Sequence, residues 1–318
     1  MSQSDGAASP ARVSQRDDAA SPTPAGERGP VSYHGQPVLK EPVWSWEIPC
    51  YLFTGGLAGA SAGVAYGAGV RGWETLSRRA WLTASAAIAV SPPLLISDLG
   101  RPERFFNMLR VFKVTSPMSV GSWILSLSGA TISVAAFHDW TGRLPRPAAV
   151  ARPLAAVSGL ALSTYTAALL TNTAVPVWHE ARRTLPFVFG AGAAVSAGGA
   201  CAAATPVDCA GGARRLAIGA AAAELAVTQL MERRLQMHEE VYRSGRAALF
   251  SRVSRGCLVA GAALMGARGA ASRRAAVAAG ALLCAGGLAT RWSVFEAGKQ
   301  SAADPRYVVE PQRRRLDG

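Results

Sequence analysis

The chain has 318 residues, half of them hydrophobic and 17% charged, with a formal net charge of +13. The apolar residues fall into about eight blocks of near membrane-spanning length, which excludes a soluble α/β protein. The arginines lie between these blocks, as is usual in membrane proteins, so the positive charge does not indicate a nucleic-acid-binding protein. We predict an all-α, polytopic protein of the cell membrane with about eight transmembrane helices.

The chain is expected to begin with a disordered tail over residues 1–42, rich in Ser, Ala, Pro, Gly and charge. This segment lacks the apolar core of a signal peptide, so no signal peptide is expected. Trp44 and Trp46 are predicted interfacial anchors, and Pro49 marks the entry to the first span. The transmembrane domain is predicted over residues 43–297, followed by a C-terminal tail at 298–318.

The first span is predicted at about Ile48–Val70. Four glycines recur in it at intervals of four residues: Gly55, Gly59, Gly63 and Gly67. This spacing places them on one helix face, where another helix can approach closely. The second span is predicted at about Ala80–Ile96, with a kink near Pro92 and Pro93.

A long segment with charged and aromatic residues, Ser97–Ser119, follows the second span. Gly100 and Pro102 break the preceding helix. From Glu103 onward the apolar spacing predicts a short amphipathic helix lying at the membrane surface. The segment also mixes an acid, basic residues and aromatic residues: Asp98, Arg101, Arg104, Phe105, Phe106, Arg110, Phe112 and Lys113. A plain juxtamembrane loop that follows the general charge rules is the simpler interpretation of this composition.

Two stretches, SDLGRPERFFNMLRVFK (97–113) and SPMSVGSW (116–123), resemble the NrfD/PsrC-type membrane subunit of polysulfide-reductase-like complexes. The stretch Ala297–Pro305 is similar to the C-terminal signature of that family. The resemblance implies an eight-helix subunit that anchors an iron–sulfur protein and exchanges electrons with menaquinone or another quinone. It also implies that the iron–sulfur protein serves a molybdopterin-type catalytic subunit.

Six further spans are predicted after this segment, at about Met118–Phe137, Leu154–Val175, Leu185–Ala204, Leu216–Met231, Val253–Ala267 and Ala275–Phe295. Eight spans place both termini on the side of the Ser97–Ser119 segment. The loops on the two sides carry nearly equal numbers of Lys and Arg, so the membrane orientation stays open.

The positions of histidine and cysteine show whether this chain could bind haem or an iron–sulfur cluster. None of the four histidines lies mid-span, so two axial haem ligands are not available. None of the five cysteines forms a CxxC pair or a cluster-type spacing. We therefore expect no haem and no iron–sulfur cluster in this subunit.

Tyr165 is the first candidate for a quinone contact, since a phenol can donate to a quinone carbonyl. It lies among hydroxyl residues near the middle of the predicted fourth span, and the resemblance implies that polar residues of this span contribute to the quinone pocket. The alternative is a tyrosine bonded to a neighbouring helix backbone. Asp98 and Arg101 could form the floor of the pocket, or could pair with each other.

Glu224 is the one acid clearly inside a predicted span, which makes it a candidate for a proton path. It could equally be held neutral or paired with an Arg of a neighbouring helix. His179, on the side of the termini, could relay protons, although an exposed loop histidine is the simpler interpretation. Arg291 and Glu296 are expected to pair near the end of the last span.

The predicted function is that of a quinone-interacting membrane subunit of an oxidoreductase complex. The residues expected to dock the iron–sulfur partner are Arg101, Arg104, Phe105 and Arg110. The alternatives are a secondary transporter or proton channel, and a purely structural anchor. Repeated halves with broken helices would favour a transporter, and the Ser97–Ser119 pattern has no copy in the second half.

Overall fold

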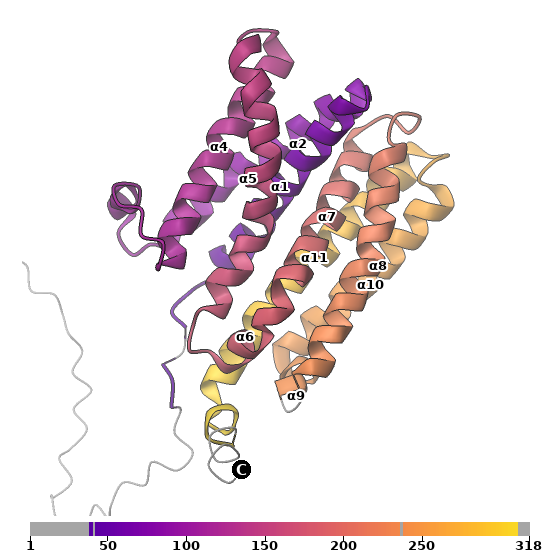
Figure 1. Ribbon diagram of the computed structural model, residues 1–318. Helices are drawn as coiled ribbons and strands as arrows, with labels where there is room; N and C mark the ends of the chain where they lie inside the picture. The colour runs from indigo at the N-terminus through magenta and orange to yellow at the C-terminus, as the bar shows by residue number, and fades with distance from the viewer. Residues whose placement is uncertain (1–37, 41, 236–237, 311–318) are drawn as a thin grey trace, which may run out of the picture. The chain divides into compact units, whose positions relative to one another are not determined.

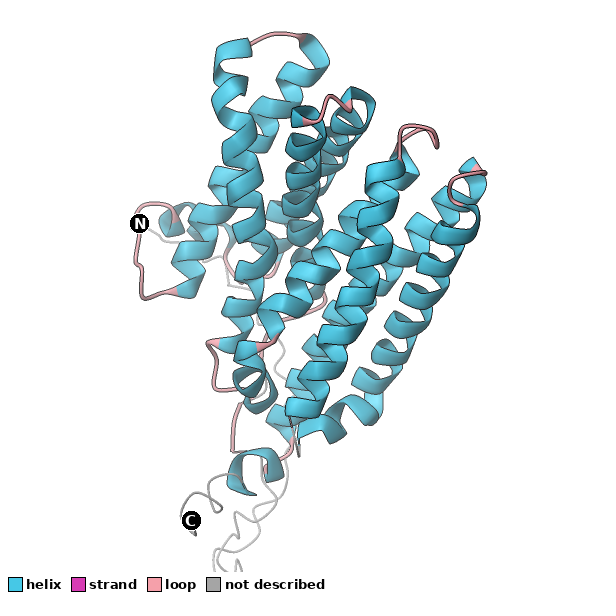
Figure 2. Ribbon diagram, turned by 45° about the vertical axis from the view of Figure 1, so that its right-hand side comes forward, coloured by secondary structure: helices cyan, strands magenta, loops and turns pink. Residues whose placement is uncertain are grey.

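The computed structural model describes residues 38–40, 42–235 and 238–310. Within these ranges the chain is helical and contains no β-strand (Figure 2). The long helices there are α1 (Glu47–Val70), α2 (Glu74–Ser97), α4 (Pro117–Thr141), α5 (Pro145–Thr171), α7 (Leu185–Ala204), α8 (Gly211–Arg234), α10 (Gly245–Arg268) and α11 (Arg273–Ala303). Short helices connect them: η1 (Pro102–Arg104), α3 (Phe105–Met108), α6 (Pro176–Glu180), η2 (Ala181–Arg183) and α9 (Glu239–Arg243).

The predicted tails fall largely outside these ranges. The N-terminal tail predicted at 1–42 covers residues 1–37 and 41, and the C-terminal tail predicted at 298–318 covers residues 311–318, all outside the described part. Helix α11 continues past the predicted domain boundary at residue 297 to Ala303.

The long helices form two bundles of four. Helices α1, α2, α4 and α5 pack against one another, and α7, α8, α10 and α11 do the same. Helix α7 joins the bundles by packing on α1 and α5, and α11 also reaches α1 (Figure 1). The two bundles are consecutive halves of the chain, so each is built mainly from neighbours in sequence.

Seven of the described helices are long and apolar enough to cross a membrane, which confirms the prediction of an all-α polytopic membrane protein. Helix α8, expected as the sixth span, is as long as α1 but less apolar. It carries arginines near both ends and Glu224 in its middle. It packs between α7 and α10, so it completes the second bundle.

Helix starts differ from the predicted span starts at several places. Helix α5 begins at Pro145 instead of Leu154, and α10 begins at Gly245 instead of Val253. Arginines near these starts lower the local hydropathy, yet arginine is a good helix former and proline is favoured in a first helical turn. Helix α2 continues through Pro92 and Pro93 to Ser97.

The start of α1 and the end of α11 lie at one end of the bundles, which we name the terminal face. Trp44, just before α1, stacks on Trp178 of α6 with ring centroids 5.7 Å apart. The Trp178 indole N–H donates to the Val294 carbonyl of α11 at 2.8 Å, and its ring lies against Gly298. Trp44, predicted as an interfacial anchor, is thus packed into the terminal face, whereas Trp46 is 58% exposed.

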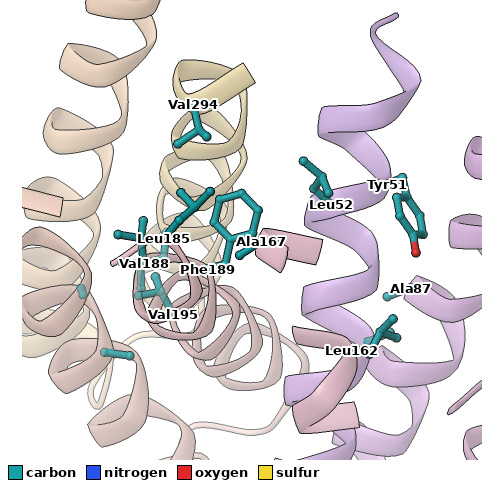
Figure 3. Packing of buried hydrophobic residues seen from close by; sticks show 14 of the residues in the cluster. Tyr51, Leu52, Ala87, Leu162, Ala167, Leu185, Val188, Phe189, Val195 and Val294 are labelled. Atoms are coloured by element: carbon teal, nitrogen blue, oxygen red, sulfur yellow. The ribbon is translucent and has the colours of Figure 1, made fainter. Parts of the chain in front are cut away.

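The core between the bundles is made of aliphatic and aromatic side chains on facing helices. Figure 3 shows Phe189 of α7 and Leu52 of α1 on the facing sides of their helices, with Val294 of α11 nearby. All three are buried. Much of the remaining core is alanine, and an alanine-rich core needs closely spaced helices to be filled.

The closest approach in the first bundle is between Gly59 of α1 and Gly159 of α5. A Cβ atom at position 59 would lie 2.1 Å from the Gly159 carbonyl oxygen. Gly55 of the same stripe packs loosely on Leu162. By contrast, a Cβ at Gly63 would meet no atom within 4 Å. The predicted close helix contact is therefore correct for the first half of the glycine stripe only.

We predict that Gly59→Ala lowers the free energy of unfolding by about 1–3 kcal/mol, because the helices must separate to admit the methyl group. Gly63→Ala, one turn away on the same helix, should be neutral or stabilising by up to about 1 kcal/mol. Unfolding of the two purified variants in detergent measures the difference. Equal effects would contradict the close packing at Gly59.

Candidate functional site

Tyr165 lies in the last third of α5, towards the terminal face, and not near the middle of the helix as predicted. Helix α5 ends at Thr171, which puts Tyr165 about 9 Å from that end along the helix axis. The predicted position along the helix is wrong because α5 starts earlier than expected, at Pro145, and ends at Thr171, before Pro176 begins α6. The Tyr165 side chain is half-buried.

The ring of Tyr165 crosses α4 at Gly121. A Cβ at position 121 would lie 1.7 Å from the phenol oxygen, so only glycine admits the ring there. The buried Tyr51 of α1 is near enough to interact electrostatically with Tyr165. No described residue hydrogen-bonds to the Tyr165 hydroxyl, which differs from the alternative of a bond to a neighbouring backbone. The phenol is therefore free to donate to a ligand.

Asp98 does not pair with Arg101, which corrects the simpler of the two expectations for these residues. The Asp98 carboxylate accepts from the Ser45 N–H at 3.1 Å and from the Ser45 hydroxyl at 2.8 Å. It thereby ties the end of α2 to the segment before α1. Arg101 is exposed and forms no ion pair with the described residues. Neither residue hydrogen-bonds to Tyr165.

The Ser97–Ser119 segment lies at the terminal face, and its predicted amphipathic helix is confirmed only as the two short turns η1 and α3. The Ser119 hydroxyl holds the segment by donating to the Val111 carbonyl and accepting from the Lys113 N–H, both at 3.0 Å. Phe105 packs partly on the core. The side chain of Arg104 lies outside what the structure describes. The exposed side chains include Arg101, Phe106, Arg110, Val111, Phe112 and Val114.

Glu224 has a partner far away in the sequence. The Glu224 Oε1 atom lies 3.6 Å from a guanidinium nitrogen of Arg291 on α11, and Thr290 donates to the same oxygen at 2.8 Å. Both charged side chains are buried, with exposures of 0% and 1%. The pairing with an Arg of a neighbouring helix, one of the alternatives, is therefore correct. The expected pairing of Arg291 with Glu296 is wrong.

Arg291 has further partners besides the Glu224 carboxylate. It donates to the Phe189 carbonyl at 2.8 Å and to the Gly287 carbonyl at 3.2 Å, and it lies 5.0 Å above the Phe189 ring. Glu224 Oε2 has no hydrogen-bond partner among the described residues. The pair thus joins α8, α11 and α7 inside the second bundle and leaves one carboxylate oxygen available.

The profile of the family described as "Polysulphide reductase, NrfD" matches residues 31–207, which is more than half of the chain. The chain belongs to the NrfD family. The match covers the first bundle, the Ser97–Ser119 segment and α7, and it confirms the suspected family. No curated protein matches the chain. This NrfD chain is thus a membrane subunit of the type found in oxidoreductase complexes.

The second bundle of this NrfD chain contains a cavity of about 210 Å³ between α8, α10 and α11, whose lining includes several hydroxyl side chains. Thr290 lines it and connects it to Glu224, and Ser254 lies 2.7 Å from the Thr290 hydroxyl. The Thr228 hydroxyl, which also lines the cavity, is buried without a partner in the described chain. The inner end of this cavity therefore reaches the buried carboxylate through hydroxyl groups.

A second cavity of about 410 Å³ adjoins the first towards α9, and both are lined by Glu232, Arg255 and Tyr242. Glu232 and Arg255 form an ion pair there. Burial, and to a lesser extent the Glu232 carboxylate, raises the pKa of the Tyr242 phenol, so this side chain stays a neutral donor. The two cavities form a polar entry from the terminal face.

His179 is not brought to Glu224. It is exposed on α6, where its carbonyl accepts from Arg182 at 3.1 Å, and it lines neither of these cavities. The residues that sequence reasoning missed are Thr290 and Gly121. Arg291 was named with the wrong partner, although an arginine inside an apolar block indicates a buried partner. In the described ranges no three His, Cys, Asp or Glu side chains gather as metal ligands.

Proposed function

We propose that this NrfD subunit holds an iron–sulfur protein at its terminal face and exchanges electrons between that protein and a quinone, menaquinone or another. The iron–sulfur protein would in turn serve a molybdopterin-type catalytic subunit. The family supports a place in an oxidoreductase complex. The observation that carries the quinone part is the free phenol of Tyr165, placed beneath the face that carries the Ser97–Ser119 segment.

The surroundings of Tyr165 suit a quinone. A bound quinone takes up two electrons and two protons, and its carbonyl oxygens need hydrogen-bond donors in an apolar site. Tyr165 offers an unused donor, and Tyr51 is a second phenol beside it. A site near the terminal face also shortens the distance to a cluster carried by a protein docked there. Asp98 and Arg101 remain predicted contributors to the rim of this site.

We predict that Tyr165→Phe lowers quinone-dependent turnover of the assembled complex. Loss of a buried hydrogen bond costs about 1–3 kcal/mol, which corresponds to a fall of about 5-fold to 150-fold in kcat/KM. The ring still fills the space over Gly121, so assembly should persist. The control is Tyr66→Phe, which removes a phenol hydroxyl from α1 at the end away from the terminal face. Unchanged kinetics with quinone would show that the Tyr165 hydroxyl has no such role.

The docking part rests on the exposed surface of the Ser97–Ser119 segment. It presents Arg101 and Arg110 beside Phe106 and Phe112, which are 72% and 57% exposed. Arginine and aromatic residues are enriched in the cores of protein interfaces. The Ser119 hydrogen bonds fix the segment in place before a partner binds, which lowers the entropic cost of docking.

We predict that Arg101→Glu combined with Arg110→Glu releases the iron–sulfur partner from membranes, because the two changes reverse the charge of the docking surface. Co-purification of the partner measures the effect, with an expected loss of at least about 10-fold in recovered partner. Arg79→Glu combined with Arg146→Glu places the same charges at the opposite end of the bundles. Equal recovery from both double variants would exclude docking at this segment.

A second candidate function is proton transfer through the second bundle. We infer a route from the cavity beside Glu232 and Arg255, past Ser254 and Thr290, to Glu224. The observation that favours it is the hydrogen-bonded link from a hydroxyl-lined cavity through Thr290 to a buried carboxylate, whose other oxygen has no partner in the described chain. His179 does not line this route, so its predicted part in the proton path gains no support from it.

We predict that Glu224→Gln slows proton-coupled quinone turnover and also lowers stability by about 3–5 kcal/mol, since it leaves Arg291 unpaired. The two effects are separable. The double variant Glu224→Gln with Arg291→Gln removes both charges and should recover most of the stability, while turnover stays slow. Thermal unfolding and quinone turnover of both variants measure this. If the double variant regains wild-type turnover along with stability, the carboxyl is structural only.

A further inference from the structure

The second half of the glycine stripe on α1 faces an open groove. A Cβ at Gly63 would meet nothing within 4 Å, and a Cβ at Gly67 would meet only the Arg71 guanidinium, 3.6 Å away. Both glycines line a cavity of about 880 Å³. Packing of helices therefore does not account for these two positions, and the missing side chains leave space for another molecule.

The groove lies in the seam between the two bundles. Helix α1 forms its floor, and α5 and α7 form its walls, which spread apart towards the α7–α8 connection (Figure 1). At the narrow end Thr164 of α5 meets Gly190 of α7. Leu160 on the rim is 60% exposed in a membrane-spanning helix, so the groove reaches the lipid-facing surface. From Ala60 to Arg71 the floor is about 16 Å long, about half the hydrocarbon thickness of a bilayer.

The wide end of the groove is positively charged. Arg71 and Arg215 both line it, and no acidic residue is among its described lining residues. Arg71 lies 5.7 Å from the Trp73 ring and donates one hydrogen bond, to the Gly67 carbonyl at 3.3 Å. Arg215 is exposed and has no ion pair with the described chain. The N-terminus of α8, at Gly212, adds free backbone N–H groups at the same end.

We propose that this groove binds one anionic phospholipid. An acyl chain lies along Gly63 and Gly67, and the phosphate lies at Arg71 and Arg215. The groove length matches one leaflet, and the charge lies at the end where the headgroup of that leaflet would be. The lipid would fill the part of the seam beyond the contact of Thr164 with Gly190, where α5 and α7 spread apart. Neither Gly121 nor Tyr165 lines this groove, so the proposal does not depend on the proposed quinone site.

The test compares phosphatidylglycerol with phosphatidylcholine of the same acyl chains, titrated into the purified, delipidated full chain and followed by native mass spectrometry. We expect one tightly bound phosphatidylglycerol. Arg71→Gln combined with Arg215→Gln should weaken it about 25-fold, taking about fivefold for each arginine near the membrane surface. Phosphatidylcholine binding should change little in this variant. Gly63→Leu should reduce binding of both lipids, because its side chain fills the groove without disturbing helix packing.

Two matched controls separate the groove from general lipid adhesion. Arg79→Gln removes an exposed arginine near the same end of the bundles, and Gly219→Leu adds a leucine at an open position of α8 outside the groove. Both should bind phosphatidylglycerol as wild type does. The proposal is overturned if Gly63→Leu binds as well as Gly219→Leu, or if the two lipids bind equally. The proposal is also overturned if a quinone is recovered with the wild-type chain and is lost from Gly63→Leu, because the groove would then bind quinone.

Discussion

The close approach of helix backbones at glycine is the constraint on which the structure depends. Inside a membrane, helices gain little from hiding apolar surface from lipid, so attraction between them depends on packing distance. Gly59 meets Gly159 between α1 and α5, and Gly199 meets Gly280 between α7 and α11. A Cβ at Gly59 would lie 2.1 Å from the Gly159 carbonyl oxygen, and a Cβ at Gly280 would lie 2.5 Å from the Gly199 carbonyl oxygen. Each bundle therefore has at least one crossing that no larger residue could replace.

The same constraint makes room for the two polar sites. Tyr165 reaches over α4 only because position 121 has no side chain. In the second bundle, a Cβ at Gly192 would lie 2.1 Å from a guanidinium nitrogen of Arg291 and 2.6 Å from Glu224 Oε1. Glycine on one helix thus creates the volume that a functional side chain of another helix occupies. These glycines are part of the candidate sites although they carry no chemistry.

Apolar blocks and a family-like segment were enough to predict the fold class, the family and the limits of α7. They were not enough to predict which polar side chains pair. Glu224 and Arg291 come from different apolar blocks, and Asp98 accepts a hydrogen bond from Ser45, which precedes the first span. Periodicity placed four glycines on one face but could not show that the face meets a helix at Gly59 and open space at Gly63. The position of Tyr165 along its helix was predicted wrongly, because hydropathy does not locate a helix start that is rich in Pro and Arg.

Helix α8 shows why low hydropathy does not exclude a place in the bundle. Three of its charged residues have partners: Glu224 pairs with Arg291, Glu232 pairs with Arg255, and Arg214 donates to the Val207 carbonyl. A buried ion pair, however, is rarely worth more to stability than an apolar pair of the same volume. Stability alone therefore does not explain an acid at position 224. The proposed proton route would explain it, because Thr290 links Glu224 to a cavity lined by hydroxyl groups.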